Sequence, residues 1–390
     1  MKKELVICNY NDKKLIALLE DDELVERYEE DENDKSIEGN IYVGKVQNIL
    51  TGLQSAFVNI GEKRNAFIHV KDILPKVDIT KDDVIDTKPI NALIRPGAPL
   101  IVEVKKEAID KKGPRLSTHI TLTSRLIVFM PNATFTTVSQ KIEDKEERDR
   151  LKTIVEKHLP EGTGAIVRTV AKGKTEEEIK EDILKTVEKW KIIQNRQIEK
   201  IPQKIYDKGG VLKKTIVDLV DSDLNRIVVE SEEDYEKIEN ILNEIDSDTK
   251  LEIDPDIKSK NNLSKQVEES KNVKIWLKSG AFITIEKTEA LVAIDVNSGK
   301  FIGKKDVEET IKAVNIEAAK EISKQIRLRD ISGIIIIDFI DMKLDESKEA
   351  VIKEIIKESK KDRSKIQVEE FTKLNLMEIT RKHINSKKTF

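Results

Sequence analysis

The sequence predicts a mixed α/β (α+β) protein of several structural units, and three observations lead to that prediction. The chain has 390 residues, which is too long for one ordinary hydrophobic core, so about two to four units are expected. Short β patterns punctuated by glycine fill residues 39–121 and are typical of a small barrel. Near the carboxyl end, two apolar strand patterns flank one long helical pattern, which predicts a strand-helix-strand crossover.

Composition narrows the class of protein. Charged residues make up 37% of the chain, aromatic residues 4% and apolar residues 38%, which indicates a folded protein with heavily charged helix surfaces. The net charge of −4 shows no basic excess, so any nucleic-acid site must be a local patch. Apolar stretches are too short for a membrane span or a signal peptide. Cys8 is the only cysteine, so we expect a cytoplasmic protein without an internal disulfide or a zinc site of its own.

The first two thirds of the chain predict alternating elements. Strands are expected at 4–8 and 14–20, followed by a polar stretch through Asp34. Further strands at 126–130 and 165–169 accompany helices at 144–158 and from about Glu176, the second of which begins with a capping box at Thr175 and Glu178. Residues 208–272 alternate strand and helix, and 254–262 are predicted to form an exposed, mobile loop.

The last third predicts the crossover. Strands at 281–286 and 290–295 precede a helix from about Asp306, and Gly333 separates that helix from a strand at 334–339. The apolar face of the helix is predicted to comprise Val307, Ile311, Val314, Ala318, Ile322 and Ile326. Since such crossovers almost always join parallel neighbours, Asp295 and Asp338 should both lie at the carboxyl edge of the sheet.

Two strand-end carboxylates at one edge suggest a metal site. A hard cation such as Mg²⁺ prefers one or two carboxylates together with water and phosphate oxygens. Asp295 and Asp338 could supply them, and Asn297 points to the same side of an extended chain as Asp295. Asp341 and Glu289 are further oxygen donors expected nearby. Alternatively, each aspartate caps a turn or the next helix, and spacing alone leaves both interpretations open.

Two further patterns suggest contacts with RNA. Phe57 and Phe67 could present ring faces to unpaired bases from the predicted barrel, although phenylalanines in a β unit are commonly core residues. Arg168 and Thr169, followed by a capped helix, are the parts of a phosphate pocket. The alternative is that Arg168 is an ordinary surface residue.

These segments, in this order, resemble the catalytic half of the bacterial ribonuclease E/G family, and the resemblance covers essentially the whole chain. It rests on the barrel segment and on VFMPN at 128–132, GAIVRT at 164–169, AIDVNS at 293–298, QIRLRD at 325–330 and IIDFIDM at 336–342. The family implies an endoribonuclease that is specific for single strands, depends on Mg²⁺ (with Mn²⁺ as an alternative), prefers 5′-monophosphorylated RNA and acts in RNA decay or ribosomal RNA processing. Its products would carry 5′-phosphate and 3′-hydroxyl ends.

The resemblance also implies a domain plan and residue roles. Residues 1–36 and 208–278 would form a ribonuclease-H-like unit without chemistry of its own, 37–120 an OB-type barrel like that of ribosomal protein S-one, 121–207 a 5′-phosphate sensor and 279–390 a deoxyribonuclease-I-like catalytic unit. Asp295 and Asp338 match the metal ligands, and Asn297 matches the asparagine that supports them. Residues that match RNA contacts are Phe57, Phe67, Lys112 and Lys365. Residues that match the 5′-phosphate pocket are Ser124, Val128, Arg168 and Thr169.

The chain departs from the family pattern in three places. Ser124 stands where the family tends to have glycine, and Lys365 replaces an arginine, so it can hold a phosphate only as a point charge. The sequence ends at Phe390 without the Cys-Pro-x-Cys element that links subunits through zinc, so we expect no zinc-linked assembly. The expected partners are single-stranded messenger and precursor ribosomal RNA and a second subunit bound through the catalytic unit. The alternative function is a weakly active or non-catalytic RNA-binding scaffold.

Overall fold

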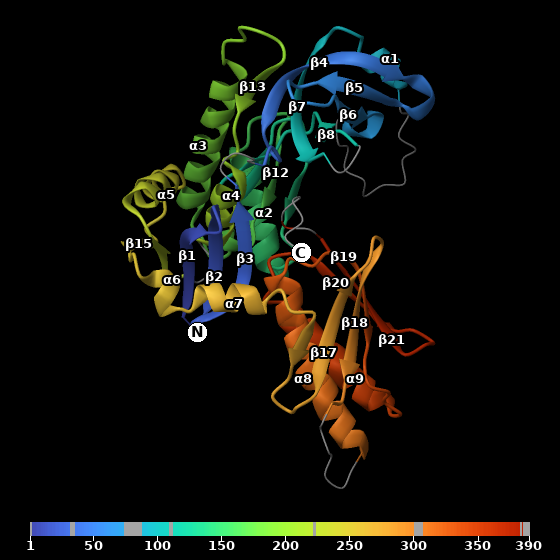
Figure 1. Ribbon diagram of the computed structural model, residues 1–390. Coiled ribbons are helices and arrows are strands. Elements are labelled where there is room, and N and C mark those ends of the chain that lie inside the picture. Colours follow the sequence, from blue (N-terminus) through green and yellow to red (C-terminus); the bar gives the residue numbers. More distant parts are fainter. Residues whose placement is uncertain are drawn as a thin grey trace. The chain divides into compact units, whose positions relative to one another are not determined.

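The computed structural model describes residues 2–31, 36–73, 88–108, 112–220, 224–299, 307–382 and 384. The chain forms two compact units, each assembled from segments that are distant in the sequence (Figure 1). Unit 1 comprises Met1–Glu32, Leu224–Glu239 and Thr249–Phe390, and unit 2 comprises Asn33–Asp223 and Asn240–Asp248. The predicted mixed α/β class is confirmed, and no helix in the described ranges has the length and apolar character of a membrane span.

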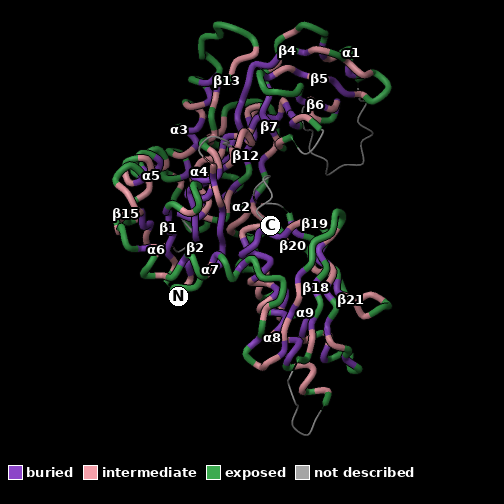
Figure 2. Tube along the Cα trace, in the orientation of Figure 1, coloured by how far each residue is buried: buried purple, intermediate pink, exposed green. Residues whose placement is uncertain are grey.

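Unit 1 contains a five-stranded sheet in the order β15-β14-β1-β2-β3. Its antiparallel strands are β1 (Lys3–Tyr10), β2 (Lys13–Glu20) and β3 (Glu23–Glu30), and β14 (Arg226–Val229) and β15 (Lys250–Ile253) extend it in parallel. Both β1 and β2 are buried along most of their length (Figure 2). The sequence did not predict β3, because its many charged residues resemble a solvated loop, whereas Leu24, Val25 and Tyr28 are buried.

Helices α5 (Glu232–Glu244), α6 (Ile257–Lys260) and α7 (Leu263–Glu269) follow these strands. The prediction of an exposed loop over 254–262 is wrong, since this stretch contains α6. Ile257 is buried in one core cluster with Val228 and Leu263, and Lys260 Nζ donates to Asp254 Oδ2 at 2.7 Å. One apolar side chain within a polar stretch therefore anchors the segment, and so short a signal has no periodicity.

The second sheet of unit 1 has the order β16-β17-β18-β19-β21-β20. Its strands are β16 (Lys274–Trp276), β17 (Phe282–Lys287), β18 (Leu291–Asn297), β19 (Gly333–Asp338), β20 (Ile366–Phe371) and β21 (Leu376–Arg381). Helices α8 (Val307–Leu328) and α9 (Asp345–Ser359) cover one face (Figure 1). The predicted crossover is confirmed, because α8 joins the parallel strands β18 and β19. Val307 is the exception on the predicted helix face, because it is 76% exposed at the start of α8.

A buried ion-pair network joins the two sheets of unit 1. Glu26 of β3 is fully buried and accepts hydrogen bonds from Arg327 Nε at 2.7 Å and Arg363 Nη2 at 2.8 Å. Burial would raise the pKa of Glu26, but the charges of Arg363 and Arg327 outweigh it and lower the pKa to about 2. This carboxylate therefore stays ionised and connects β3 to α8 and to the segment before β20.

Arg381 forms a second buried ion-pair network in unit 1. Its guanidinium donates to Asp330 at 2.6 Å and Asp362 at 2.8 Å, and all three side chains are nearly inaccessible. Arg329 donates to Gln325 at 2.7 Å. The stretch 325–330, which carries part of the family resemblance, thus has a structural role in joining buried elements.

Unit 2 contains a closed barrel of five strands, as predicted. They are β4 (Ile41–Leu50), β5 (Ser55–Asn59), β6 (Ala66–His69), β7 (Pro99–Lys106) and β8 (Arg115–Ser117), and β4 pairs with both β5 and β7 to close the barrel. Short helices η1 (Thr51–Leu53), η2 (Val70–Asp72) and α1 (Ile90–Leu93) lie between the strands, and β13 (Gln203–Tyr206) pairs with the first residues of β4. Val46, Ile68 and Val102 belong to the barrel core.

A four-stranded sheet in the order β11-β12-β10-β9 completes unit 2. Its strands are β9 (Leu122–Thr123), β10 (Ile127–Met130), β11 (Thr136–Val138) and β12 (Gly164–Val167). The accompanying helices are α2 (Lys145–His158), η3 (Thr169–Ala171), α3 (Glu176–Gln194) and α4 (Gly210–Leu219). The predicted capping box at Thr175 and Glu178 is present. Gly164 allows β11 and β12 to approach, because a Cβ there would lie 2.3 Å from the Phe135 carbonyl oxygen.

Candidate active site

Asp295 and Asp338 lie opposite each other on neighbouring parallel strands. They are register partners at the carboxyl ends of β18 and β19, and both are exposed. The preceding residues Ile294 and Ile337 are buried in the core, so strand alternation turns both carboxylates to the face that α8 and α9 do not cover. The sheet edge predicted for these two residues is therefore present.

Of the other oxygen donors predicted near this pair, Asn297 and Asp341 lie at the same end of the strands and Glu289 does not. Asn297 Nδ2 donates to Asp295 Oδ2, and Asp341 lies just beyond β19 with Asn375 Nδ2 3.5 Å from its Oδ1. Glu289 does not belong to the site. It lies in the turn before β18, roughly 20 Å along the strand from Asp295 at about 3.3 Å per residue. The prediction that Glu289 lies near Asp295 is wrong, because Glu289 precedes β18 and lies at its amino end, whereas Asp295 lies near its carboxyl end.

The electrostatics of the pair suit a divalent cation. Burial raises the pKa of Asp338, and the nearby charges of Asp295 and Asp341 raise it further. A cation would relieve this repulsion, and the donors are the carboxylate and amide oxygens that Mg²⁺ prefers. Within the described ranges, no group of three or more histidine, cysteine, aspartate or glutamate side chains is arranged to hold a metal ion. The residues therefore fit a cation held by two carboxylates that keeps other coordination positions for water and phosphate.

Asn315 is a positioning residue that the sequence did not reveal. It lies fully buried on α8, donates from Nδ2 to the Ile340 carbonyl at 2.7 Å and accepts from the Ile340 amide at 3.2 Å. These two bonds fix the backbone between Asp338 and Asp341. A polar residue beside Val314 in an apolar helix face was the only available signal.

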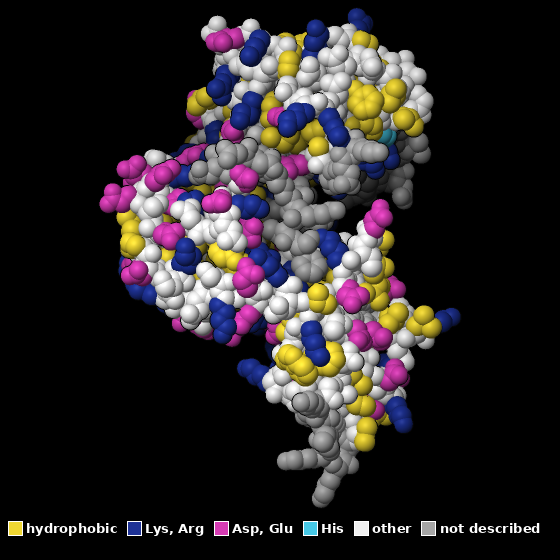
Figure 3. All heavy atoms as spheres, viewed as in Figure 1, with side chains coloured by type: hydrophobic (Ala, Val, Ile, Leu, Met, Phe, Trp, Pro, Cys, Tyr) yellow, Lys and Arg dark blue, Asp and Glu magenta, His cyan; other side chains and the backbone are white. Residues whose placement is uncertain are grey.

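Phe57 and Phe67 form an aromatic pair on the barrel. They are register partners on β5 and β6, both are half-buried, and their ring centroids lie 6.3 Å apart in an edge-to-face arrangement. Hydrophobic side chains gather on the barrel surface in the view of Figure 3. The rings are therefore neither fully buried core nor isolated surface residues, which suits a stacking surface.

Basic residues lie beside this pair. Lys112 is exposed, and Gly113 packs so closely on β6 that a Cβ would lie 2.0 Å from the Asn65 carbonyl oxygen. Arg115 pairs with Phe67 across β6 and β8 and binds Asp72 at 3.0 Å. Arg115 was not predicted as a site residue, because one arginine carries no pattern in the sequence.

Lys365 is separated from the aspartate pair within unit 1. It is exposed just before β20, and its carbonyl oxygen accepts from the Lys382 amide. The antiparallel register of β19 and β21 places this end beside Gly333, roughly 17 Å along the strand from Asp338 at about 3.3 Å per residue. The structure therefore places Lys365 near the opposite end of the same sheet.

Arg168 is held by unit 2 rather than lying free on its surface. Its Nη1 donates to the Ser124 carbonyl at 2.8 Å, and its Nη2 lies 3.2 Å from Asp218 Oδ1. Val128 lies on the adjacent strand β10, opposite Ile166. The structure thus brings Ser124, Val128 and Arg168 together, and any phosphate there would compete with Asp218 for the guanidinium.

Thr169 and Ser124 have their own hydrogen-bond partners. The Thr169 hydroxyl lies 2.9 Å from the Ser139 hydroxyl, at the edge of β11. The Ser124 hydroxyl lies 2.6 Å from Asp182 Oδ2, which also accepts from the Leu126 amide at 3.0 Å. Burial raises the pKa of Asp182, although these hydrogen bonds oppose the rise. Asp182 thereby fixes the turn that carries Ser124.

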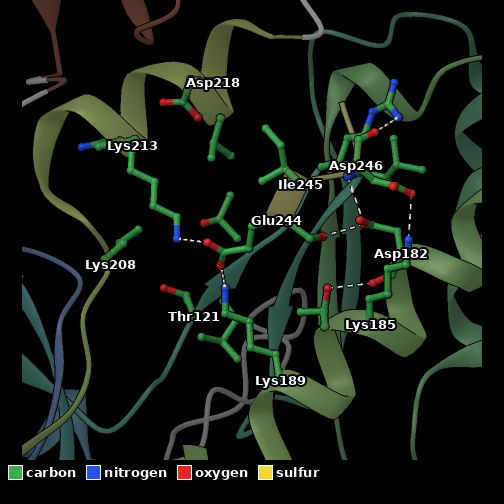
Figure 4. A pocket seen from close by; sticks show the side chains of 18 of the residues that line it. Thr121, Asp182, Lys185, Lys189, Lys208, Lys213, Asp218, Glu244, Ile245 and Asp246 are labelled. Atoms are coloured by element: carbon green, nitrogen blue, oxygen red, sulfur yellow. Dashed lines mark hydrogen bonds and ion pairs between the residues drawn. The ribbon is translucent and has the colours of Figure 1, made fainter. Parts of the chain in front are cut away.

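A charged cavity of about 230 Å³ borders this turn. Figure 4 shows Lys189 and Lys213 pointing toward Glu244, and Lys189 Nζ donates to Glu244 Oε1 at 2.6 Å. Burial would raise the pKa of Glu244, but the hydrogen bonds from Lys189 and Lys213 lower it. The sequence did not predict this cavity, because its lining comes from six separate segments.

Comparison with known proteins agrees with the motifs. Residues 121–384 match the Ribonuclease E/G family model. The chain is 38% identical over 376 residues to Ribonuclease G of Haemophilus influenzae, an alignment that covers 94% of this chain and 77% of that protein. It is 34% identical over 391 residues to Ribonuclease G of Escherichia coli, with 98% and 80% covered.

A longer relative gives the same result. The chain is 36% identical over 356 residues to Ribonuclease E of a Nostoc species, with 88% of this chain and 51% of that protein covered. The match of the family model includes both aspartate motifs, 293–298 and 336–342. This chain therefore belongs to the ribonuclease E/G family.

Proposed function

We propose that this protein is a metal-dependent endoribonuclease that cuts single-stranded RNA, as part of RNA decay or ribosomal RNA processing in the cytoplasm. The observation that carries the proposal is the placement of Asp295 and Asp338 as register partners on parallel strands, with Asn297 hydrogen-bonded to Asp295. The relatives named above are ribonucleases, which makes a phosphodiester the matching substrate.

Each residue of the pair has a part in this mechanism. Asp295 and Asp338 would hold Mg²⁺, or Mn²⁺ in its place, and Asn297 would orient the Asp295 carboxylate through their hydrogen bond. The bound cation would supply Lewis-acid stabilisation of the phosphate and a lower pKa for the attacking water. Water adds to phosphorus in line as the bond to the 3′ oxygen breaks, which leaves a 5′-phosphate and a 3′-hydroxyl.

The RNA contacts are proposed for the barrel and the sheet end. The Phe57 and Phe67 rings would stack on unpaired bases, and Lys112 would neutralise a neighbouring phosphate. Lys365 would contact the phosphate backbone of the RNA near the far end of the sheet that carries the aspartate pair. By the same family relationship, we infer a ribonuclease-H-like and a deoxyribonuclease-I-like part within unit 1, and a homodimer through the latter.

A preference for 5′-monophosphorylated RNA is the finer part of the proposal. Arg168 and Thr169 directly follow β12, Ser124 lies in the turn before β10, and Val128 lies on β10. A guanidinium, hydroxyls and an apolar side chain therefore lie near one end of this sheet. Arg168→Ala should abolish any difference in cleavage between 5′-monophosphate and 5′-hydroxyl ends. An unchanged ratio of the two cleavage rates would show that Arg168 has only a structural role, which its bonds to Ser124 and Asp218 would explain.

The central test is cleavage of a 5′-monophosphorylated, A/U-rich oligonucleotide with Mg²⁺. Asp295→Asn and Asp338→Asn should each lower the cleavage rate by at least 100-fold, or roughly 2.7 kcal/mol of transition-state stabilisation. Undiminished cleavage by both variants would refute the assignment of the site. RNA binding by the wild type without turnover at any protein concentration would instead favour a non-catalytic scaffold.

A further inference from the structure

A partly exposed aromatic pair lies beside the aspartate pair on the same sheet. Strand pairing places Trp276 of β16 opposite Phe282 of β17, and Phe282 opposite Asn297 of β18. The next row along the strands contains Lys274, Thr284, Asp295 and Asp338. Two adjacent cross-strand rows on one face thus hold the aromatic rings and the carboxylates.

These rings do not belong to the core. Trp276 is 56% exposed and Phe282 is half-buried, whereas Ile275 between Lys274 and Trp276 packs against the core on the other face. The ring centroids of Trp276 and Phe282 lie 5.2 Å apart, and Lys274 Nζ lies 4.2 Å and 3.6 Å from them. Figure 3 shows hydrophobic side chains over β17 with a basic side chain among them.

We propose that Trp276, Phe282 and Lys274 form a stacking platform for unpaired bases of the RNA strand whose phosphate is cleaved at the aspartate pair. This inference rests on the proposed nuclease function. Neighbouring strands lie about 5 Å apart. Phe282 is therefore about 5 Å from Asn297, and Trp276, one strand further, is roughly 10 Å from it. A short run of nucleotides spans that distance. The Lys274 ammonium would form an ion pair with a phosphate next to the stacked base.

The charges on this face favour one path for the part of the RNA strand next to the carboxylates. The row on the far side of the carboxylates contains Glu286, Ala293, Ile336 and Glu378, and both glutamates are exposed. Those acidic side chains repel RNA phosphates. Lys274 instead stands in the carboxylate row with its ammonium over the Trp276 and Phe282 rings, so the RNA next to the carboxylates continues over these two rings.

The chemistry of the platform also selects the kind of nucleic acid. Each base has a π-face that is available only when the base is unpaired, and stacking on aromatic side chains tolerates any sequence. A duplex hides those faces. The platform therefore binds single strands in preference to duplexes and contributes affinity without reading sequence.

The protein carries its own reporter for this contact. It has two tryptophans, of which Trp190 is 8% exposed in the core of unit 2 and Trp276 is 56% exposed. In the 390-residue chain with Asp338→Asn, which should slow cleavage at least 100-fold, titration with a short unstructured RNA oligonucleotide should quench the fluorescence of the exposed tryptophan. The same oligonucleotide in a duplex should quench much less. The Trp276→Phe variant should lose the signal.

Affinity and kinetics provide the second measurement. Trp276→Ala should weaken single-strand binding about tenfold, and Trp276→Phe only two- to threefold because it keeps a ring. In cleavage assays of protein with Asp338 intact, Trp276→Ala should raise KM and leave kcat nearly unchanged. Ile334→Ala is the matched control, since Ile334 is a 50% exposed residue of the same face beyond the acidic row. It should leave KM and affinity unchanged.

Two outcomes would overturn the platform. One is a Trp276→Ala variant that binds RNA as tightly as the wild type, together with no quenching of Trp276 at saturating RNA in protein that retains this tryptophan. The other is a variant that changes only the molecular mass in solution, which would make this face a contact between copies of the chain. If the wild type fails to cleave but RNA still quenches Trp276, the nuclease proposal fails and the platform stands.

Discussion

Glu26→Gln tests how unit 1 is held together. Glu26 is fully buried between Arg327 and Arg363, and its pKa is lowered from 4.5 to about 2. That difference corresponds to roughly 3 kcal/mol of native-state stability at neutral pH. The amide leaves two buried guanidiniums without their counter-charge, so a loss of about 3–5 kcal/mol is expected. For a unit of roughly 200 residues, the Tm should fall by about 6–20 °C.

The pH dependence gives the sharper readout. Since the folded-state pKa of Glu26 is depressed, its contribution is present above about pH 4.5 and is lost as the pH falls toward 2. Urea unfolding of the wild type should therefore show a loss of stability across this range that Glu26→Gln lacks.

Glu349→Gln is the control for this experiment. Glu349 and Lys353 form an exposed pair on α9 at 3.1 Å, so its loss should cost about 0.5 kcal/mol or less. A cost below 1 kcal/mol for Glu26→Gln at pH 7, or an unchanged pH profile, would refute the reasoning.

Three further predictions concern the sites. Gly113→Ala would place a Cβ 2.0 Å from a facing backbone carbonyl, so it should destabilise the protein by about 1–3 kcal/mol and weaken RNA binding. Gly52→Ala, which meets nothing within 4 Å, should do neither in the same melting and binding assays. Asp218→Asn removes the charge beside Arg168 and should lower KM for 5′-monophosphorylated RNA severalfold. A raised KM would contradict that competition. Because the pKa of Asp338 is raised, Asp338→Asn should keep or increase the metal-free Tm at pH 7, and a lower Tm would contradict the predicted repulsion.

The elements that the sequence predicted are those with strong periodicity. The alternation at the end of β18, the apolar run of β19 and the helical spacing of α8 together predicted the crossover and the register of Asp295 with Asp338. The barrel was also predictable, because its glycines and short β runs recur in order. Each of these signals comes from one continuous stretch of chain.

The features that the sequence did not predict depend on contacts between distant segments. The charged strand β3 is stable only because Glu26 meets Arg327 and Arg363, which follow it by about 300 residues in the sequence. In the sequence, Asn315 is a polar residue within an apolar helix face. Its role depends on the Ile340 backbone, which only the tertiary structure places against it. The Trp276 platform exists only through the register of three strands. Partners of this kind are set by tertiary structure and leave no local pattern.

Metal-dependent stabilisation, measured beside cleavage, tests the central claim most directly. Saturating Mg²⁺ at about 100 times its Kd should stabilise the wild type by about 2.7 kcal/mol and support cleavage of single-stranded RNA. Asp295→Asn and Asp338→Asn should fold with an unchanged or higher metal-free Tm, gain little stability from Mg²⁺ and cleave at least 100-fold more slowly. Equal gain and equal cleavage in the wild type and both variants would contradict a metal site at these two carboxylates.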